Sequence, residues 1–233
     1  MTATRQQIAD WLSLFVAPDQ VTELRCLPRD PNPDRLKVAG GYFDGAHLTD
    51  MAREAWHFSN TGQYAVYFTP NPLQPEMLAR RTNRCMVGKP DKGFAHDADV
   101  QYRRWFFVDV DPVRPDANKD DSASDAEKAA AWEVAQRVRD ELRDTGGWGE
   151  PSVVVDSGNG WHLYYPVHAA DTVPQSDGAH RLLQVLAHLC DTDAAKIDVR
   201  VGNPARIMKV PGTLSNKGVS TVERPHRVCK VVG

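Results

Sequence analysis

The 233-residue sequence contains neither a long uncharged apolar run nor a closely spaced pair of cysteines. No segment approaches the roughly 18 apolar residues that a membrane-spanning helix needs. The N-terminus carries Arg5 and Asp10 within an amphipathic pattern, which is not the pattern of a signal peptide. We therefore expect a soluble, cytoplasmic protein.

The four cysteines are also too far apart for the usual structural zinc site. Such a site needs Cys and His ligands at short spacing, and the nearest combination is Cys85 with His96. We expect four reduced, mostly buried thiols and no zinc.

The charge is modest overall but unevenly distributed. Hydrophobic residues make up 41% and charged residues 25% of the chain, typical of a globular protein with one large domain or two small ones. Residues 109–127 hold seven acids against two bases, a local net charge of −5, and residues 197–233 hold seven bases against two acids, a local net charge of +5. An acidic cluster and a basic tract in one small protein suit a metal site that handles a polyanion.

The first hundred residues alternate between helical and strand-like patterns. Apolar residues recur at helical spacing from Ile8 to Phe15, Thr4 can cap this helix, and Pro18 ends it. Further along, the patterns predict strands at 21–27, 36–43 and 63–69, helices at 47–58 and near 75–84, and a loop over 88–101.

The second half is more regular. The patterns predict a strand at 103–111, a helix at 125–144 that begins with a Ser124–Glu127 capping box, strands at 151–156 and 161–167, a helix at 176–190, and a last strand at 205–210. This β-α-β-β-α-β order is the ferredoxin-like one, which RNA-recognition (RRM-like) folds also use. The predicted class is α+β, with an N-terminal α/β module over 1–101 and an RRM-like module over 102–233.

That strand order predicts where the acidic residues meet. The first and third strands are central in such a sheet, and the fourth flanks the first. Asp109 and Asp111 are two residues apart on the first strand, so their side chains leave the same face. His162 lies on the third strand and Asp198 just before the fourth, so all four side chains can gather on one open face.

The pair Asp109 and Asp111 is the sharpest local signal. Two acids at the end of a hydrophobic strand are costly unless they are solvated or bound to a cation. Magnesium takes one or two carboxylates together with phosphate oxygens and water. The alternative is a strand that ends in a solvated acidic turn before Pro112, and Asp198 after Ile197 favours the metal site.

The turn that joins the predicted strands at 151–156 and 161–167 has two interpretations. An Asn-Gly pair is a common hairpin turn and needs no function. Alternatively, backbone amides of a glycine-rich turn bind phosphates together with His162. The turn residues are Ser157, Gly158, Asn159 and Gly160.

Three basic residues follow Asp198 closely and suit a triphosphate. They are Arg206, Lys209 and Lys217. Arginine binds phosphate oxygens bidentately, and lysine acts as a point charge. The alternative is a solvated basic edge.

Together these segments resemble the archaeo-eukaryotic primase superfamily, and in particular its bacterial, phage and plasmid primase-polymerases. The likeness rests on FVDVDP, SGNGWHLYY, and Ile197-Asp198 followed by NPARIMKVPGTLSNKG. Those enzymes share a hydrophobic-DxD motif, a second motif ending in histidine, and a hydrophobic-Asp motif. The resemblance spans about residues 40–228, since GYF, YFTPNPLQPEMLARRTNR and ERPHR also fit the phage-type branch.

The resemblance implies the archaeo-eukaryotic primase fold and a role for each motif. It implies that Asp109, Asp111 and Asp198 bind two Mg²⁺ or Mn²⁺ ions. It further implies triphosphate contacts by His162 and Ser157, and by the three basic residues named above. In several branches the serine stands two before the histidine, whereas Gly160 occupies that position here. Some relatives carry a zinc module, and this sequence shows none.

The expected activity is therefore that of a primase-polymerase, with single-stranded DNA as template, a primer, and NTPs or dNTPs as substrates. Arg80, Arg81 and Arg84 would line the template path, with salt-dependent affinity. A helicase or accessory domain is an expected partner. The alternatives are a DxD-type glycosyltransferase, which uses a cation to hold a nucleotide diphosphate, and a non-catalytic RRM-like module, which would present stacking aromatics.

Overall fold

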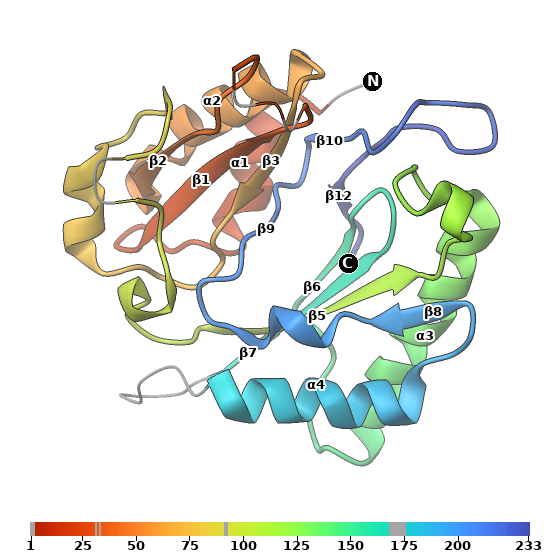
Figure 1. The fold of residues 1–233 in the computed structure, drawn as a ribbon. Coiled ribbons are helices and arrows are strands. Elements are labelled where there is room, and N and C mark those ends of the chain that lie inside the picture. The colour runs from red at the N-terminus through yellow and green to blue at the C-terminus, as the bar shows by residue number, and fades with distance from the viewer. Residues whose placement is uncertain (1–2, 31, 33, 91–92, 168–175) are drawn as a thin grey trace. The chain divides into compact units, whose positions relative to one another are not determined.

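A computed structural model describes residues 3–30, 32, 34–90, 93–167 and 176–233 (Figure 1). The chain forms two compact units. Within the described residues, the first comprises 1–104 and 204–214, and the second comprises 105–167, 176–203 and 215–233. The chain therefore leaves the first unit near the predicted position and returns to it for residues 204–214, which the sequence analysis had assigned to the second module.

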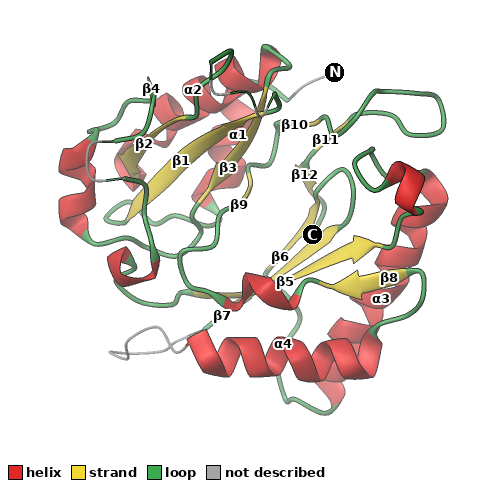
Figure 2. Cartoon of the chain, in the orientation of Figure 1, coloured by secondary structure: helices red, strands yellow, loops and turns green. Residues whose placement is uncertain are grey.

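The first unit is a five-stranded antiparallel sheet with helices. Its strands have the order β4-β2-β1-β3-β9 (Figure 2). The elements are α1 (Arg5–Ser13), β1 (Val21–Pro28), β2 (Ala39–Asp44), η1 (Gly45–His47), α2 (Leu48–Asn60), β3 (Tyr64–Phe68), η2 (Pro75–Arg80), β4 (Met86–Val87), η3 (Asp97–Asp99) and β9 (Met208–Lys209).

The first helix, α1, begins at the predicted cap and buries apolar residues of the predicted pattern. The Thr4 side chain accepts the Gln7 N–H, and Gln7 returns a bond to the Thr4 N–H, which completes a capping box. The helix buries Ile8 and Leu12, and α2 packs against it and buries Met51. The predicted first helix and the first three strands are thus confirmed, with boundaries shifted by a few residues.

The second unit contains the other five-stranded sheet, of order β12-β6-β7-β5-β8. Its elements are β5 (Trp105–Pro112), η4 (Asp116–Asn118), α3 (Asp125–Asp144), β6 (Val153–Asp156), β7 (Trp161–Pro166), α4 (Ser176–Cys190), β8 (Ala195–Ile197), η5 (Val199–Gly202), β11 (Arg227–Val228) and β12 (Lys230–Val231). A short strand β10 (Leu214–Ser215) pairs with β11.

One predicted strand was placed wrongly. The order β-α-β-β-α-β is present, and β5 lies between β7 and β8 as expected, but the fourth strand is Ala195–Ile197 and not residues 205–210. Met208 and Lys209 do form a strand, which pairs with β3 of the first unit. Three residues are too few to produce a readable alternation, so the sequence pattern favoured the longer apolar run downstream.

Alternation along β5 and β7 separates the two faces of the second sheet. On the helix-covered face, Trp161 packs against Trp132 of α3 with ring centroids 4.4 Å apart, and its indole N–H donates to the Lys128 carbonyl. The opposite face carries Phe107, Asp109 and the side chains opposite them on β7. Among the described residues, no helix is both long and apolar enough to cross a membrane.

Gly41 of β2 marks a close crossing of two chain segments. A Cβ at this position would lie 1.8 Å from the Arg84 carbonyl oxygen. We predict that Gly41→Ala lowers the free energy of unfolding by about 1–3 kcal/mol because backbone must move to admit the methyl group. Thermal and urea unfolding measure the change, with Gly149→Ala as control, since nothing lies within 4 Å of its Cβ. Equal stability of the two variants would contradict the crossing.

Candidate active site

The β5 strand delivers two acids to the face of the second sheet that lies opposite α3. Its residues from Trp105 to Val108 are buried, Asp109 is half-buried and Asp111 is exposed. The aromatic and β-branched run supplies the core, and the two acids follow as the strand leaves it. Their two-residue spacing directs both carboxylates to one face.

Strand pairing then brings two further predicted residues beside Asp109. His162 is its register partner on β7, and the His162 Nε2 lies 3.5 Å from the Asp109 Oδ1. On the other side, the Asp198 N–H donates to the Asp109 carbonyl oxygen at 2.8 Å. His162, Asp109 and Asp198 therefore lie on three adjacent chain segments.

The electrostatics of Asp111 show how crowded the acids are. Although the residue is exposed as a whole, the protein around its carboxyl displaces water and raises its pKa. The Asp198 carboxylate raises it further, while Arg114, Lys217 and Arg200 lower it. Three carboxylates thus share one region with three cationic side chains, of which the sequence analysis had named only Lys217.

The Asp198 carboxylate is held by Arg200. Its Oδ1 accepts the Arg200 backbone N–H at 3.0 Å and the guanidinium Nε at 2.9 Å, and its Oδ2 lies 3.3 Å from an Nη. These bonds raise the pKa of Arg200, and the charges of Asp111 and Asp109 add to the effect. The Arg200 side chain is nevertheless 82% exposed.

Arg114 also lies near Asp111, and one of its hydrogen-bond donors is unsatisfied. Its Nε is buried and has no hydrogen-bond partner within the described part of the chain. A buried unsatisfied donor is costly, so such a group is a candidate for ligand contact. Arg114 stands three residues after Asp111, inside the stretch that the sequence analysis considered only as an acidic loop.

His162 is uncharged at neutral pH. Burial lowers its pKa to about 4, and the Asp156 carboxylate opposes this only in part. Its Nδ1 lies 3.5 Å from the Tyr164 hydroxyl, whose ring stands edge-on to the imidazole. A neutral imidazole beside Asp109 is suited to fixing the orientation of that carboxylate.

The backbone amides of the turn at 157–160 are used by the turn itself. The Gly158 N–H donates to Asp156 Oδ1 at 2.8 Å, and the Gly160 N–H donates to Ser157 Oγ at 2.9 Å. The Ser157 N–H donates to the Gly160 carbonyl at 3.0 Å, and the Asn159 N–H to Ser157 Oγ at 3.4 Å. These bonds favour the plain hairpin interpretation over a cradle of amides for phosphate.

Gly160 has a steric reason to be glycine. A Cβ here would lie 2.2 Å from the Val110 carbonyl oxygen and 3.2 Å from Asp111 Oδ1. The turn can therefore sit beside the acidic end of β5 only without a side chain at this position.

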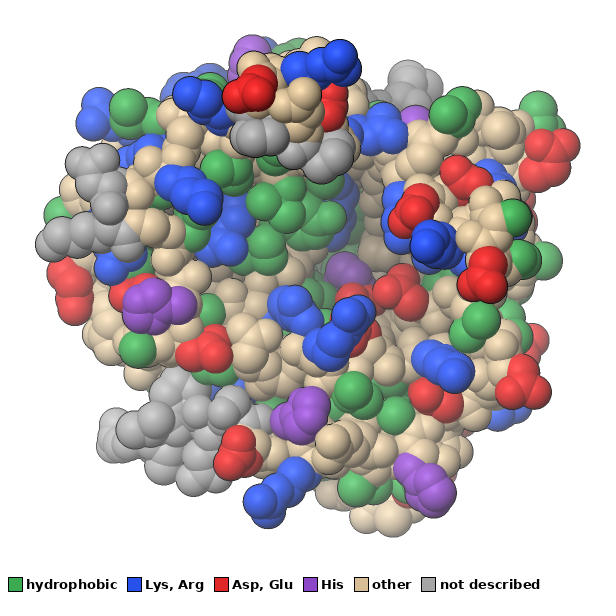
Figure 3. Space-filling model, in the orientation of Figure 1, with side chains coloured by type: hydrophobic (Ala, Val, Ile, Leu, Met, Phe, Trp, Pro, Cys, Tyr) green, Lys and Arg blue, Asp and Glu red, His purple; other side chains and the backbone are tan. Residues whose placement is uncertain are grey.

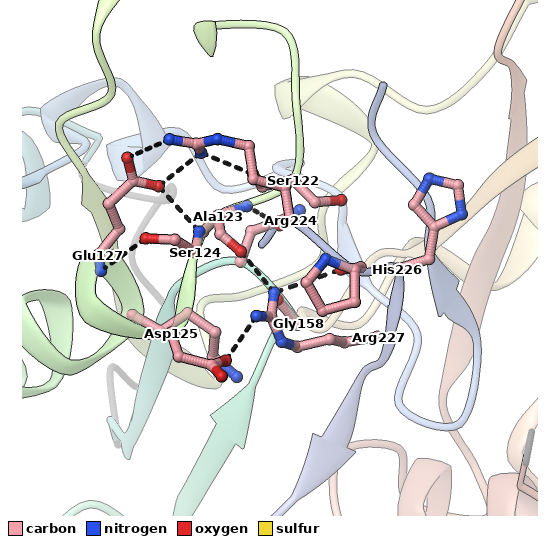
Figure 4. Close-up of polar contacts among 12 residues, drawn as sticks. Ser122, Ala123, Ser124, Asp125, Glu127, Gly158, Arg224, His226 and Arg227 are labelled. Carbon is pink, nitrogen blue, oxygen red and sulfur yellow. Dashed lines mark hydrogen bonds and ion pairs between the residues drawn. The ribbon is translucent and has the colours of Figure 1, made fainter. Parts of the chain in front are cut away.

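The basic C-terminal tract holds the acidic loop and the turn together (Figure 4). Arg224 forms two 2.7 Å bonds with the Glu127 carboxylate and donates to the Ser122 carbonyl at 2.9 Å. Arg227 donates to the Ala123 carbonyl and to Asp125 Oδ1, both at 2.6 Å. Two of the seven basic residues counted after residue 197 therefore have structural partners.

The same region is tied to the turn by uncharged groups. The Asn159 Oδ1 accepts the Ala123 N–H at 2.9 Å, and Ser215 Oγ donates to the Ser157 carbonyl. Ser122 Oγ donates to the Lys217 carbonyl at 2.9 Å, and the charge of the exposed Lys217 side chain lowers the pKa of Asp111. On the face drawn in Figure 3, acidic and basic side chains are interspersed.

The remaining predicted residues lie in the first unit. Lys209 is buried on β9, with its Nζ 5.2 Å from the Tyr67 ring centroid, and Arg206 is half-buried. Arg81 is buried, and its Nη1 donates to three carbonyls, of Gly40, Met86 and Gly88.

The two neighbouring arginines differ in their surroundings. Arg80 lies 3.2 Å from Asp99, with which it forms an ion pair, whereas Arg84 is exposed. Burial and three carbonyl bonds give Arg81 a structural role that its sequence context did not indicate. Arg84 is the predicted template contact that solvent can reach most freely.

The acidic donors fit a hard cation better than zinc. Carboxylates suit Mg²⁺ or Mn²⁺, of which the former needs only one or two beside phosphate oxygens and water. Within the described residues, no three His, Cys, Asp or Glu side chains converge as a ready ion site, and Asp198 is bound to Arg200. Asp109 and Asp111 are therefore the two carboxylates whose number and type suit one such cation, and Asp198 is the third acid beside them.

Comparisons with known proteins address the fold. No family model and no curated protein matches the chain. One solved structure, described as "Crystal structure of primase RepB'", matches with a TM-score of 0.54 and 13% sequence identity. The fold is similar to that of primase RepB'. The match covers 99% of this chain but 56% of the RepB' chain, so this chain spans little more than half of that protein.

The buried neutral His162 predicts a pH-dependent stability. Its folded pKa lies below the unfolded value of 6.5, so its contribution to stability is complete above pH 6.5 and falls as the pH drops toward 4. Between pH 7 and pH 5 we expect a loss of about 2 kcal/mol from this group. Urea unfolding in EDTA should show His162→Gln to be less acid-sensitive by that amount, while His188→Gln, exposed on α4, matches wild type. Parallel pH profiles for all three proteins would contradict the assignment.

Proposed function

We propose that this chain is the catalytic core of a primase-polymerase, a template-dependent nucleotidyltransferase that makes or extends a primer from NTPs or dNTPs on single-stranded DNA. The observation that carries the proposal is the group of three acids, Asp109 and Asp111 on β5 and Asp198 directly after the neighbouring β8, together with the cationic side chains near them. The similarity of the fold to primase RepB' supports the same conclusion.

Each group near the acids has a use in nucleotidyl transfer. The three carboxylates would hold divalent ions, which when bound activate a 3′-hydroxyl and stabilise the departing pyrophosphate. His162 keeps the Asp109 carboxylate oriented. Lys217 and Arg114 provide positive charge for the triphosphate, as a point charge and a guanidinium respectively.

The two alternative functions have less support. A DxD-type glycosyltransferase would explain the Asp109–Asp111 pair, but the fold comparison favours a primase. A non-catalytic RRM-like module needs exposed aromatics for base stacking. The aromatics on the acidic face, Trp105, Phe107 and Tyr164, are each no more than 4% exposed. They are therefore core residues.

The first test removes the acids while preserving their shape. We predict that Asp109→Asn with Asp111→Asn lowers Mn²⁺-dependent incorporation of labelled nucleotide more than ~100-fold, because the reacting groups lose their positioning. Primer synthesis is measured on single-stranded DNA, with NTPs and dNTPs compared separately. The control, Asp116→Asn with Asp120→Asn, removes the same charge from exposed positions and should retain activity. Full activity in the first variant would refute the proposal.

The second test concerns the template. We predict that Arg84→Ala weakens binding of single-stranded DNA and reduces the log–log salt slope by roughly 0.7, the loss of one phosphate contact. Fluorescence anisotropy at several salt concentrations measures both quantities. Arg137→Ala, exposed on α3, should leave the slope unchanged. An unchanged slope in Arg84→Ala would remove this residue from the template path.

A further inference from the structure

The carboxylate of Asp198, a predicted metal ligand, has both of its oxygens engaged by the Arg200 guanidinium. The pair is local, since the two residues are separated by a single position, and the Arg200 backbone N–H also bonds to the same carboxylate. The Arg200 side chain is 82% exposed, so solvent surrounds most of it even while it binds Asp198.

The charges around this pair are balanced. Asp109, Asp111 and Asp198 interact with Arg114, Lys217 and Arg200, three negative groups against three positive ones. A divalent cation that binds the acids adds positive charge beside Arg200 and competes directly for Asp198. Exposed ion pairs are weak, commonly below about 1 kcal/mol, so an incoming cation can break this one.

A triphosphate supplies the released guanidinium with a new partner. Phosphate oxygens accept the same two-pronged bonds that Arg200 now gives to Asp198. Its neighbours Lys217 and Arg114 already face the acids, and the buried Arg114 Nε has a hydrogen bond still to make. An anion held there would meet three cations.

We propose that Arg200 is an exchangeable counter-ion: it holds Asp198 before a divalent ion binds and moves to the nucleoside triphosphate when the ion takes its place. The inference rests on the proposed function and deepens it, since it names how the site changes between its empty and loaded states. Arg200 acts as a positioning residue for Asp198 in the first state and as a triphosphate contact in the second.

The proposal predicts opposite effects on two ligands. In EDTA-stripped protein, Arg200→Gln should bind Mn²⁺ about two- to fivefold more tightly, because the competitor for Asp198 is gone. At saturating Mn²⁺ the same variant should bind a fluorescent dATP analogue roughly fivefold or more weakly, because one phosphate contact is lost. Calorimetry or Mn²⁺ electron paramagnetic resonance gives the first quantity, and fluorescence titration gives the second.

Three further proteins sharpen the measurement. Arg181→Gln removes one exposed arginine from α4 and should match wild type in both assays. Arg200→Lys keeps the charge but not the fork, so it should remain near wild type for Mn²⁺ and lie between the two for nucleotide. In an Asp198→Asn background, Arg200→Gln should change Mn²⁺ affinity much less, because the direct competition acts through Asp198 and only the longer-range charge effect on Asp111 and Asp109 is left.

The possible results separate the two proposals. Opposite shifts of the two affinities, with the Mn²⁺ shift much reduced in the Asp198→Asn background, support the exchange, and an undiminished Mn²⁺ shift there overturns it. A loss of affinity for both ligands indicates local structural damage and overturns it, as do unchanged affinities in Arg200→Gln when wild type binds both ligands. A wild-type chain that binds neither Mn²⁺ nor nucleotide overturns the proposed function, and the inference falls with it.

Discussion

The antiparallel pairing of β5 with β7 on one side and β8 on the other is the constraint on which the rest of this site depends. It sets His162 opposite Asp109 and brings the Asp198 backbone to the Asp109 carbonyl. A shift of one residue in either register would turn an acid toward the helices, where a charge would be buried without a partner. Because α3 and α4 pack behind the sheet and disfavour such a shift, their packing fixes the positions of the acids as well as stabilising the fold.

A second set of interactions holds the loops around that sheet. Arg224 and Arg227 bind the start of α3, and Asn159 and Ser157 bind the segments beside it. Each of these bonds joins parts of the chain far apart in sequence. The hairpin turn is thereby fixed next to the end of β5. The turn can approach the Val110 carbonyl this closely because Gly160 has no side chain. The residues that hold the loops in place are thus different from the acids proposed to carry out the chemistry.

Much of this arrangement could be predicted because it follows from local patterns. The capping boxes of α1 and α3, the SGNG hairpin and the two-residue spacing of Asp109 and Asp111 depend on neighbours in the sequence. The strand at 195–197 could not be recognised, since three residues carry no period. The run at 208–209 belongs instead to the sheet of the first unit, because it pairs with β3.

The roles of the basic residues were the least predictable. Composition alone cannot separate Arg81, which bonds three carbonyls, from the exposed Arg84 three positions later. Nor does it separate Arg224, which binds Glu127, from Arg200, which binds an acid of the site. A charged side chain acquires its function from its partners, and those partners lie up to a hundred residues away.

The account's central claim is that Asp109, Asp111 and Asp198 together hold a divalent ion against a triphosphate. The most direct measurement is a crystal structure of the whole chain with Mn²⁺ and a non-hydrolysable nucleotide, using anomalous scattering to locate the metal. The account predicts Mn²⁺ peaks within about 2.0–2.4 Å of oxygens from these carboxylates and from the nucleotide phosphates. Mn²⁺ and nucleotide bound elsewhere on the chain, with the three acids unligated, would contradict it.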